Sequence, residues 1–260
     1  MTGKAKGINL FMGLCLASAF ALRTLAGPTL IVVGDSLTSD RPPEAVAASW
    51  ARALEQYMKP GCTIDNHAKG GASTKSFLDS GRWAKAVAAV KPGDYVLIQF
   101  GANDRKRHTK FYLEKRFADH RTTFRDIIRR FVKEVREKGG KPVLVSESAA
   151  ATFDENGKYF ERVDARGVSV ATYAKAMQEL SEELKTEFVD MNKMTRDLMV
   201  KVGKDEALKF YVISTGMIDP KTGKPSKDVG HTVKAGAEAY AKLFLDDVKK
   251  RNLEISELFK

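Results

Sequence analysis

Short runs of β-branched and aromatic residues alternate along this chain with longer stretches of helical periodicity, and this alternation limits the fold more than any other feature. The short runs lie at residues 29–33, 62–68, 94–100, 142–148 and 188–191. The helical stretches lie at residues 43–58, 74–90, 122–140, 169–187 and 233–250. Strands that alternate with helices form a parallel sheet with both faces covered. The sequence therefore predicts an α/β fold, a three-layer α/β/α sandwich around a five-stranded parallel sheet.

The first 26 residues have the composition of a targeting segment. Lys4 and Lys6 precede an apolar run at residues 8–22, and small residues follow it. This is the layout of a secretory signal peptide, and the run is shorter than the ~20 residues that a bilayer span needs. We predict a signal peptide over 1–26, a single domain over 27–260 without a further membrane span, and a secreted or periplasmic location. An uncleaved N-terminal anchor is the alternative, and the oligomeric state is not indicated.

Positive charge is concentrated in one segment of the chain. The formal net charge is +11, and residues 105–121 alone hold seven Lys or Arg residues against two acidic ones. Such a segment is either a solvated loop or a platform for an acidic partner, a uronic-acid polysaccharide or a nucleic acid. For a secreted protein a polysaccharide is the better expectation, and nucleic acid is not expected.

Four polar or small residues follow four of the predicted strands. They are Ser36, Gly71, Asn103 and Glu147. In open α/β sheets ligands bind beyond the carboxyl ends of the strands. We therefore expect these four residues to lie at one edge of the sheet.

Ser36, in the stretch "TLIVVGDSLTSD", is a candidate nucleophile, with helix capping and anion binding as alternatives. A serine hydroxyl attacks a carbonyl only when a base takes its proton, and a third group must hold that base in one tautomer. His231 lies three residues after Asp228, just before the last helical stretch, and this spacing suits such a pair. Asp104 and His108 form a rival pair by spacing alone.

Attack on a carbonyl also requires donors for the oxyanion that forms. Gly71 can offer a backbone N–H where the second strand turns into a helix, and the Asn103 amide can donate to the same oxygen. The alternatives are a plain turn at Gly71 and a local Asx-turn at Asn103. Their joint order with Ser36 and the Asp-x-x-His pair favours the catalytic interpretation.

The stretches "GDSLT", "GG" before "AST", "GAND" and "DVGHT" resemble the four sequence blocks of the SGNH or GDSL-type hydrolase superfamily. Within it, "NHAKGGASTKSF", "KPGDYVLIQFGAND", "KPVLVSESAAATFDENGK" and "HTVKAGAEAYAKLF" look most like rhamnogalacturonan acetylesterases, carbohydrate esterase family 12. The resemblance covers nearly the whole predicted mature chain. It implies the flavodoxin-like SGNH-hydrolase fold.

The resemblance also implies a catalytic apparatus. Ser36 would be the nucleophile, His231 the general base and Asp228 the residue that orients it. The oxyanion hole would consist of the Ser36 N–H, the Gly71 N–H and the Asn103 side chain. The superfamily needs neither a metal ion nor an organic cofactor.

Ala102 departs from the pattern of rhamnogalacturonan esterases, which carry "GHND" where this chain has "GAND". The oxyanion donor is kept, but a polar side chain is lost, and this bears on the sugar more than on the acyl chemistry. We interpret Asp35 and Asp104, which fall within the motifs, as residues that brace their turns.

These observations predict a secreted serine esterase that removes O-acetyl groups from an acidic polysaccharide such as pectic rhamnogalacturonan. A lipase, thioesterase or arylesterase on the same fold is an alternative, although the basic, polar sequence near the motifs disfavours a long acyl chain. A non-catalytic carbohydrate-binding protein with the same fold is a further alternative.

Overall fold

Five parallel strands form the centre of the molecule. The computed structural model describes residues 27–42 and 44–260, so the predicted signal peptide, residues 1–26, lies outside the described residues. The strands are β1 (Thr29–Gly34), β2 (Thr63–Asn66), β3 (Tyr95–Gln99), β4 (Lys141–Val145) and β5 (Glu187–Val189). They pair in parallel in the order β2-β1-β3-β4-β5, the doubly wound order of flavodoxin-like folds. The predicted α/β class and five-stranded sheet are confirmed.

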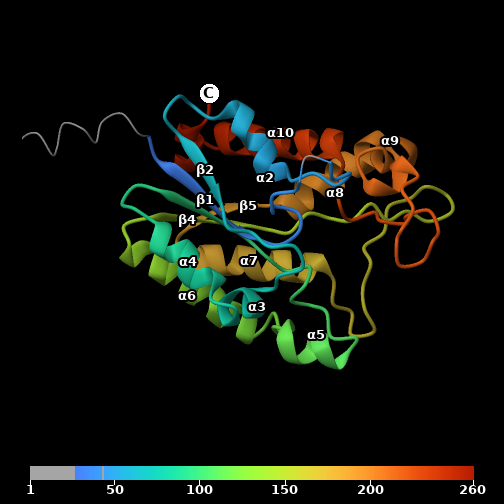
Figure 1. Cartoon of the computed structure of the whole chain (residues 1–260), viewed down its shortest axis with the longest axis horizontal. Coiled ribbons are helices and arrows are strands. Elements are labelled where there is room, and N and C mark those ends of the chain that lie inside the picture. The colour runs from blue at the N-terminus through green and yellow to red at the C-terminus, as the bar shows by residue number, and fades with distance from the viewer. Residues whose placement is uncertain (1–26, 43) are drawn as a thin grey trace, which may run out of the picture.

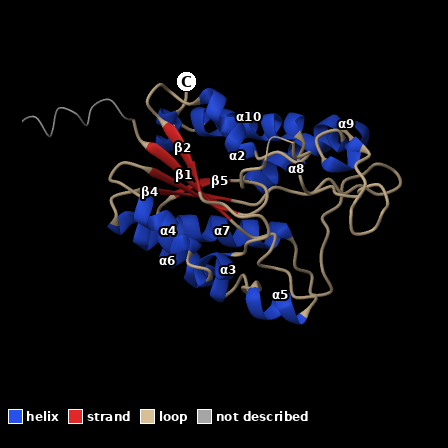
Figure 2. Ribbon diagram, in the orientation of Figure 1, coloured by secondary structure: helices blue, strands red, loops and turns tan. Residues whose placement is uncertain are grey.

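Helices cover both faces of this sheet (Figures 1 and 2). The helices of one face are α2 (Trp50–Ala53), α8 (Met191–Val202) and α10 (Lys234–Lys250). Those of the other are α3 (Thr74–Asp79), α4 (Arg82–Ala89), α6 (Thr123–Glu137) and α7 (Val170–Leu184). Shorter elements complete the chain: α5 (Lys110–Lys115), α9 (Lys204–Leu208) and the 3-10 turns η2 (Leu54–Tyr57), η3 (Val212–Thr215) and η4 (Glu254–Leu258).

Strand side chains alternate between two hydrophobic cores. On β1, Leu30 and Val32 join the core beneath α2, α8 and α10, while Ile31 and Val33 join the core beneath α3, α4, α6 and α7. All four are at most 1% exposed, because a parallel sheet with two covered faces buries both sides of each strand. This explains the continuous apolar runs in β1 and β3, whereas the edge strand β2, TIDN, is partly exposed.

Two helical stretches are shorter in the structure than the sequence predicts. The helix expected over 43–58 is wrong as a single helix: only α2 and η2 form, because the Ser49 side chain caps α2 and the Ala48 N–H donates to the Thr232 carbonyl instead. The helix expected over 74–90 is divided into α3 and α4 by Gly81, whose φ is +74°. A left-handed residue cannot continue an α-helix, so the chain changes direction there.

Helices α5, α8 and α9 were not expected. Helix α8 directly follows β5, with the Asp190 side chain accepting from the Lys193 N–H at its start. The apolar spacing of Met191, Met194 and Leu198 is the helical signal that identifies it. In the part of the chain that the structure describes, no helix is long and apolar enough to cross a membrane.

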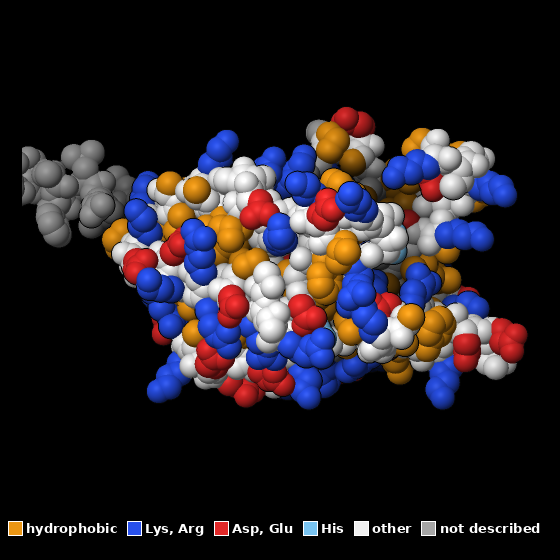
Figure 3. Space-filling model, turned by 90° about the horizontal axis from the view of Figure 1, so that it is seen from below, with side chains coloured by type: hydrophobic (Ala, Val, Ile, Leu, Met, Phe, Trp, Pro, Cys, Tyr) orange, Lys and Arg blue, Asp and Glu red, His pale blue; other side chains and the backbone are white. Residues whose placement is uncertain are grey.

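Charged side chains coat the outer helices. Figure 3 shows Lys and Arg side chains interspersed with Asp and Glu over the face that α3, α4, α5 and α6 form. Many of these charges are paired, as Arg129 is with Glu183 of α7 at 2.7 Å and Arg130 with Glu134 at 2.7 Å. Exposed ion pairs contribute at most about 1 kcal/mol each to the free energy of unfolding, so these pairs add little to the stability of the fold.

Candidate active site

The turn after β1 carries the candidate nucleophile. The Asp35 carboxylate accepts the Leu37 N–H at 3.0 Å, and the Asp35 carbonyl accepts the Ser39 N–H at 2.9 Å. A Cβ on Gly34 would lie 2.3 Å from Thr38 Oγ1, so only glycine lets the strand enter this tight turn. The turn thereby presents Ser36 at the carboxyl edge of the sheet, half-buried, above the buried Asp35.

Ser36, His231 and Asp228 form a continuous chain of hydrogen bonds. His231 Nε2 lies 2.8 Å from Ser36 Oγ, across 195 residues of sequence. On the other side of the ring, His231 Nδ1 lies 2.6 Å from Asp228 Oδ2. The His231 and Asp228 side chains are 36% and 33% exposed, so solvent reaches the imidazole. The structure thus brings together three residues that sequence reasoning grouped.

The charge of the Asp228 carboxylate sets the tautomer of the His231 imidazole. Burial raises the pKa of Asp228, but its hydrogen bonds with the His231 ring and the backbone N–H groups of His231 and Gly230 outweigh burial and lower it to about 2. The carboxylate is therefore ionised at neutral pH, and it accepts a hydrogen bond from Nδ1–H, which keeps the ring proton on Nδ1. Nε2 is then left with its lone pair directed at the Ser36 hydroxyl, as a general base requires.

Main-chain hydrogen bonds hold the loop that carries His231. The Val212 N–H donates to the His231 carbonyl at 3.0 Å, and the Ile213 N–H donates to the Asp228 carbonyl at 2.9 Å. On the opposite side, the Ala48 N–H donates to the Thr232 carbonyl at 2.7 Å. The imidazole is thus positioned by η3 and by the segment that precedes α2, neither of which the sequence analysis associated with it.

Two backbone donors beside Ser36 are free. Within residues 27–42 and 44–260, the N–H groups of Ser36 and Gly71 have no hydrogen-bond acceptor. Gly71 has a φ of +76°, and a Cβ on the adjacent Gly70 would lie 3.9 Å from the Ser36 Cβ. The glycine turn after β2 therefore passes against the serine with an unused N–H, as an oxyanion donor requires.

Asn103 is held from both ends of its amide. Its Nδ2 donates to Asp35 Oδ2 at 2.8 Å, and its Oδ1 accepts from Lys106 Nζ at 2.8 Å. These two bonds distinguish the oxygen from the nitrogen of the amide and leave one N–H of Nδ2 unused. Asn103 is 3% exposed, and its hydrogen bond to Asp35 connects it to the turn that carries Ser36.

The rival pair Asp104 and His108 is not brought together. Asp104 Oδ1 accepts from the Thr74 N–H at 2.9 Å and from the Thr74 hydroxyl at 2.5 Å, which ties the loop after β3 to the start of α3. The His108 ring packs against Tyr112 instead, with centroids 4.4 Å apart. His108 therefore lacks the carboxylate partner that its spacing suggested.

The sequence placed Glu147 at the carboxyl edge of the sheet and Lys106 in the basic segment 105–121, but it gave neither a specific role in the site and did not single out Arg166. Glu147 follows β4 and is 1% exposed, although a lone carboxyl is seldom buried without a purpose. Lys106 reaches Asn103, and Arg166 arrives from the excursion between β4 and α7. For Glu147 the signal was a charged residue directly after an apolar strand; for the other two there was no local signal.

A basic cavity of about 340 Å³ adjoins the Asn103 loop. It is lined by Arg105, Lys106, Arg107, His108, Asp164, Ala165 and Arg166. Arg105, Lys106 and Arg107 form no ion pair in the described part of the chain, whereas Arg166 pairs with Asp164 at 2.5 Å. The cavity thus holds a clear excess of positive charge close to the candidate oxyanion donor.

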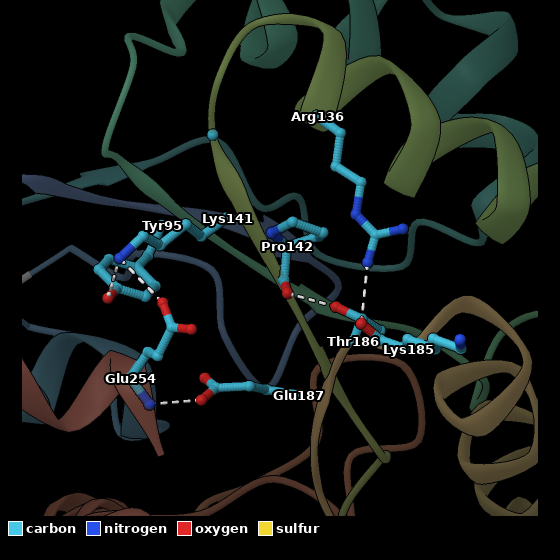
Figure 4. A pocket seen from close by; sticks show the side chains of 9 residues that line it. Tyr95, Arg136, Lys141, Pro142, Lys185, Thr186, Glu187 and Glu254 are labelled. Carbon is cyan, nitrogen blue, oxygen red and sulfur yellow. Dashed lines mark hydrogen bonds and ion pairs between the residues drawn. The ribbon is translucent and has the colours of Figure 1, made fainter.

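A second cavity, of about 200 Å³, lies at the opposite edge, where β3, β4 and β5 begin (Figure 4). Its charged groups bind one another: Lys141 Nζ lies 2.9 Å from Glu254 Oε2, and Glu187 accepts from the Glu254 N–H. Arg136 donates to the Leu184 carbonyl at 2.8 Å. These contacts tie η4 to the sheet and α6 to the end of α7, and the cavity is structural. Among the described residues no group of three or more His, Cys, Asp or Glu side chains could hold a metal ion.

Three known proteins resemble this chain over most of its length. Rhamnogalacturonan acetylesterase RhgT of Bacillus subtilis (strain 168) is 34% identical over 230 residues, which cover 88% of this chain and 92% of that protein. The crystal structure of protein YxiM from Bacillus subtilis has a TM-score of 0.70 at 24% identity; the match covers 88% of this chain but spans only 58% of that one. Axe2, an acetylxylan esterase from Geobacillus stearothermophilus, has a TM-score of 0.57 at 19% identity over 86% of this chain and 94% of its own.

The two structural matches show the fold alone, because both are less than 25% identical to this chain. The family is shown by the sequence: residues 32–210 match the GDSL-like Lipase/Acylhydrolase family. That segment contains the Ser36 turn, the Gly71 turn and the Asn103 loop. The chain therefore belongs to the GDSL-like lipase/acylhydrolase family and is an ester hydrolase.

Proposed function

We propose that this hydrolase is a carbohydrate acetylesterase with Ser36 as its nucleophile, acting on an acidic, acetylated polysaccharide of the rhamnogalacturonan type. The observation that carries the reaction type is the hydrogen-bonded chain from Ser36 through His231 to Asp228. A serine, a histidine and a carboxylate in this order are the minimum needed to activate a hydroxyl for attack on an ester.

In the acylation step, Ser36 Oγ attacks the ester carbonyl carbon while His231 Nε2 takes the hydroxyl proton. The carbonyl oxygen becomes an oxyanion, which the N–H groups of Ser36 and Gly71 and the free N–H of Asn103 stabilise. The C–O bond to the sugar then breaks, and His231 returns the proton to the departing sugar hydroxyl. Asp228 stabilises the imidazolium that exists between these two transfers.

In the deacylation step, His231 takes a proton from water, and the resulting hydroxide attacks the acetyl carbonyl of the Ser36 ester. The same donors stabilise the second oxyanion. Collapse of this intermediate releases acetate, and His231 returns the proton to Ser36 Oγ. One imidazole, that of His231, carries the proton in both steps, and one water molecule is consumed in each cycle.

The acidic polysaccharide is proposed from the charge beside the site. Besides the basic cavity, the Arg116 guanidinium lies over the rings of Phe111 and Tyr112, 5.2 and 5.0 Å from their centroids. The same guanidinium is 3.1 Å from where a Cβ on Gly71 would lie. A cation against an oxyanion donor and a stacking surface beside it suit a sugar carboxylate and a sugar ring, respectively.

Two further observations support this substrate class. The relative RhgT is named as a rhamnogalacturonan acetylesterase. The cavity that adjoins the Asn103 loop is lined by charged and polar residues apart from Ala165, which suits a sugar better than a long acyl chain. An enzyme exported through the predicted signal peptide would meet such polymers outside the cytoplasm.

The test measures acetate release from acetylated pectic rhamnogalacturonan, acetylated xylan and an aryl acetate, with wild type, Ser36→Ala and Ser80→Ala proteins. Ser80, at the end of α3, is the matched control. We expect Ser80→Ala to keep full activity and Ser36→Ala to lose turnover of every substrate while unfolding at the same temperature. Undiminished aryl acetate hydrolysis by Ser36→Ala rejects the nucleophile, and a preference for xylan over the pectic polymer rejects the substrate.

A further inference from the structure

Two buried carboxyl groups meet beneath the candidate oxyanion hole. Asp35 directly follows β1 and Glu147 follows β4, and each residue is 1% exposed. The Glu147 side chain crosses the end of β3 and hydrogen-bonds the Asp35 carboxyl. Gly101, just after β3, lies next to this crossing, since a Cβ there would be in van der Waals contact with the Glu147 Cβ at 3.7 Å.

Two carboxylates cannot hydrogen-bond each other unless one of them carries a proton. Asp35 already receives two donors, the Leu37 N–H at 3.0 Å and the Asn103 amide at 2.8 Å. Glu147 receives only one long bond, from the Ala102 N–H to Oε2 at 3.4 Å, and its Oε1 has no donor in the described residues. The donors around Asp35 favour its ionised form, so the shared proton belongs on Glu147.

The electrostatics of the surroundings agree with this assignment. Burial, and then the adjacent charge of Asp35, raise the pKa of Glu147 well above its usual range. Burial also raises the pKa of Asp35, but the Leu37 N–H, the Glu147 hydrogen bond and the charge of Lys106 act against that rise. Besides these groups, Asp104 and His231 are the charged or titratable side chains whose fields reach the pair.

We propose that Glu147 is a positioning residue, a neutral carboxylic acid whose O–H holds the Asp35 carboxylate so that Asp35 fixes the Asn103 amide for the oxyanion. Asp35 Oδ2 binds one N–H of Asn103, and Lys106 binds the amide oxygen, so the second N–H has one direction left. The chain of contacts runs from Glu147 through Asp35 to Asn103, and Glu147 itself does not touch the substrate.

Loss of the proton from Glu147 would undo this arrangement. Two adjacent buried negative charges repel, so Asp35 would take up a proton or move, and in either case Asn103 would lose its acceptor. The oxyanion donor would then be present but wrongly directed. Such a change lowers the turnover number more than it changes binding, because the interaction is made only in the transition state.

The inference rests on the proposed function only in that Asn103 donates to the oxyanion. Its test compares Glu147→Gln with Glu147→Leu, using aryl acetate kinetics and thermal unfolding. Gln can place its Nε2 amide where Glu147 has Oε1 and so keeps a donor there, and we expect its kcat to remain within about threefold of wild type. Leu has similar volume but no donor, and we expect its kcat to fall on the order of 10- to 100-fold with KM nearly unchanged, part of the effect of losing an oxyanion donor.

Two further measurements keep the test decisive if Glu147→Leu folds poorly. The kcat of wild type should decline at alkaline pH, where Glu147 ionises, and the Gln variant should lack that decline. In the Asn103→Ala background, Glu147→Gln and Glu147→Leu should differ little in kcat, because the residue through which they act is absent. Equal loss in the Gln and Leu variants, or identical alkaline limbs, would overturn the proposal without affecting the Ser36 assignment, which depends on Ser36→Ala alone.

Discussion

The Asp228 carboxylate binds the His231 ring at 2.6 Å with one oxygen and the backbone N–H groups of Gly230 and His231 with the other. The carboxylate therefore orients the loop as well as the ring. We expect Asp228→Asn to lower kcat on the order of 10³- to 10⁴-fold, because an amide NH₂ facing Nδ1 favours the wrong tautomer. Aryl acetate kinetics check this expectation, with Asp246→Asn on α10 as the control. A loss below about tenfold would contradict the orienting role.

The second prediction concerns the oxyanion donors. Asn103→Ala should lower kcat on the order of 10²- to 10³-fold and leave the labelling of Ser36 by a fluorophosphonate detectable, because the nucleophile and base remain in place. Asn156→Ala, in an exposed turn, is the matched control. Loss of labelling and of turnover in equal measure would instead indicate that Asn103 maintains the fold of the Ser36 turn.

The third prediction concerns stability and pH. Burial, opposed by the bonds from Thr74, raises the pKa of Asp104 from 3.8 to about 7. Between those values the folded protein retains a proton that the unfolded chain releases, so the free energy of unfolding falls as the pH rises from about 4 to about 7. Asp104→Asn should flatten this decline, because Asn keeps an acceptor for Thr74 and Oδ2 has no hydrogen-bond partner in the described residues.

Urea unfolding of wild type and Asp104→Asn at about pH 4.5 and about pH 7 measures the two slopes. Asp35 and Glu147 have raised pKa values as well, so part of the decline should remain in the variant. Two equal slopes would show that Asp104 is ionised in the folded protein throughout this range.

The fourth prediction tests whether the basic cavity binds the charge of the substrate without taking part in ester hydrolysis. Arg107→Ala removes one unpaired cation from the basic cavity, whereas Arg130→Ala removes an equal charge from α6, where Arg130 pairs with Glu134. We expect Arg107→Ala to raise KM severalfold for the acidic pectic polymer and to leave aryl acetate kinetics unchanged. Added salt should weaken binding by wild type more than by Arg107→Ala, because salt screens the lost attraction. Equal KM values for the two variants would place the polymer elsewhere.

The sheet was predictable because its central strands, β1, β3 and β4, are buried on both faces. Residues 95–98 of β3, for example, are all apolar, and parallel strands place their carboxyl ends at one edge, so Ser36 and Asn103 were expected together. Spacing alone did not select the histidine, since Asp104 with His108 matched the pattern as well as Asp228 with His231. The resemblance to a known superfamily selected His231, and the structure places that ring beside Ser36.

The helix boundaries and the polar contacts beneath the site were not predictable from local sequence. Gly81 divides a stretch whose apolar spacing is continuous, and Ser49 starts α2 late because the preceding residues bind the His231 loop. The contact between Asp35 and Glu147 joins residues more than a hundred positions apart through burial, and burial is a property of the packed chain. Helix α8, by contrast, had a readable apolar spacing that the sequence analysis did not use.

The bonding of the His231 loop makes tolerance to inserted residues uneven along the adjacent chain. An extra residue within 210–213 would shift the hydrogen bonds from the Val212 and Ile213 N–H groups to the His231 loop, and the imidazole would then move away from Ser36. The excursion at 217–225 is closed on itself by the bridge between Ile218 and Pro225, and its tip at 220–223 is exposed. Residues can therefore be inserted at that tip without changing the position of the His231 ring. The tip is the place to add an affinity peptide or a sugar-binding segment.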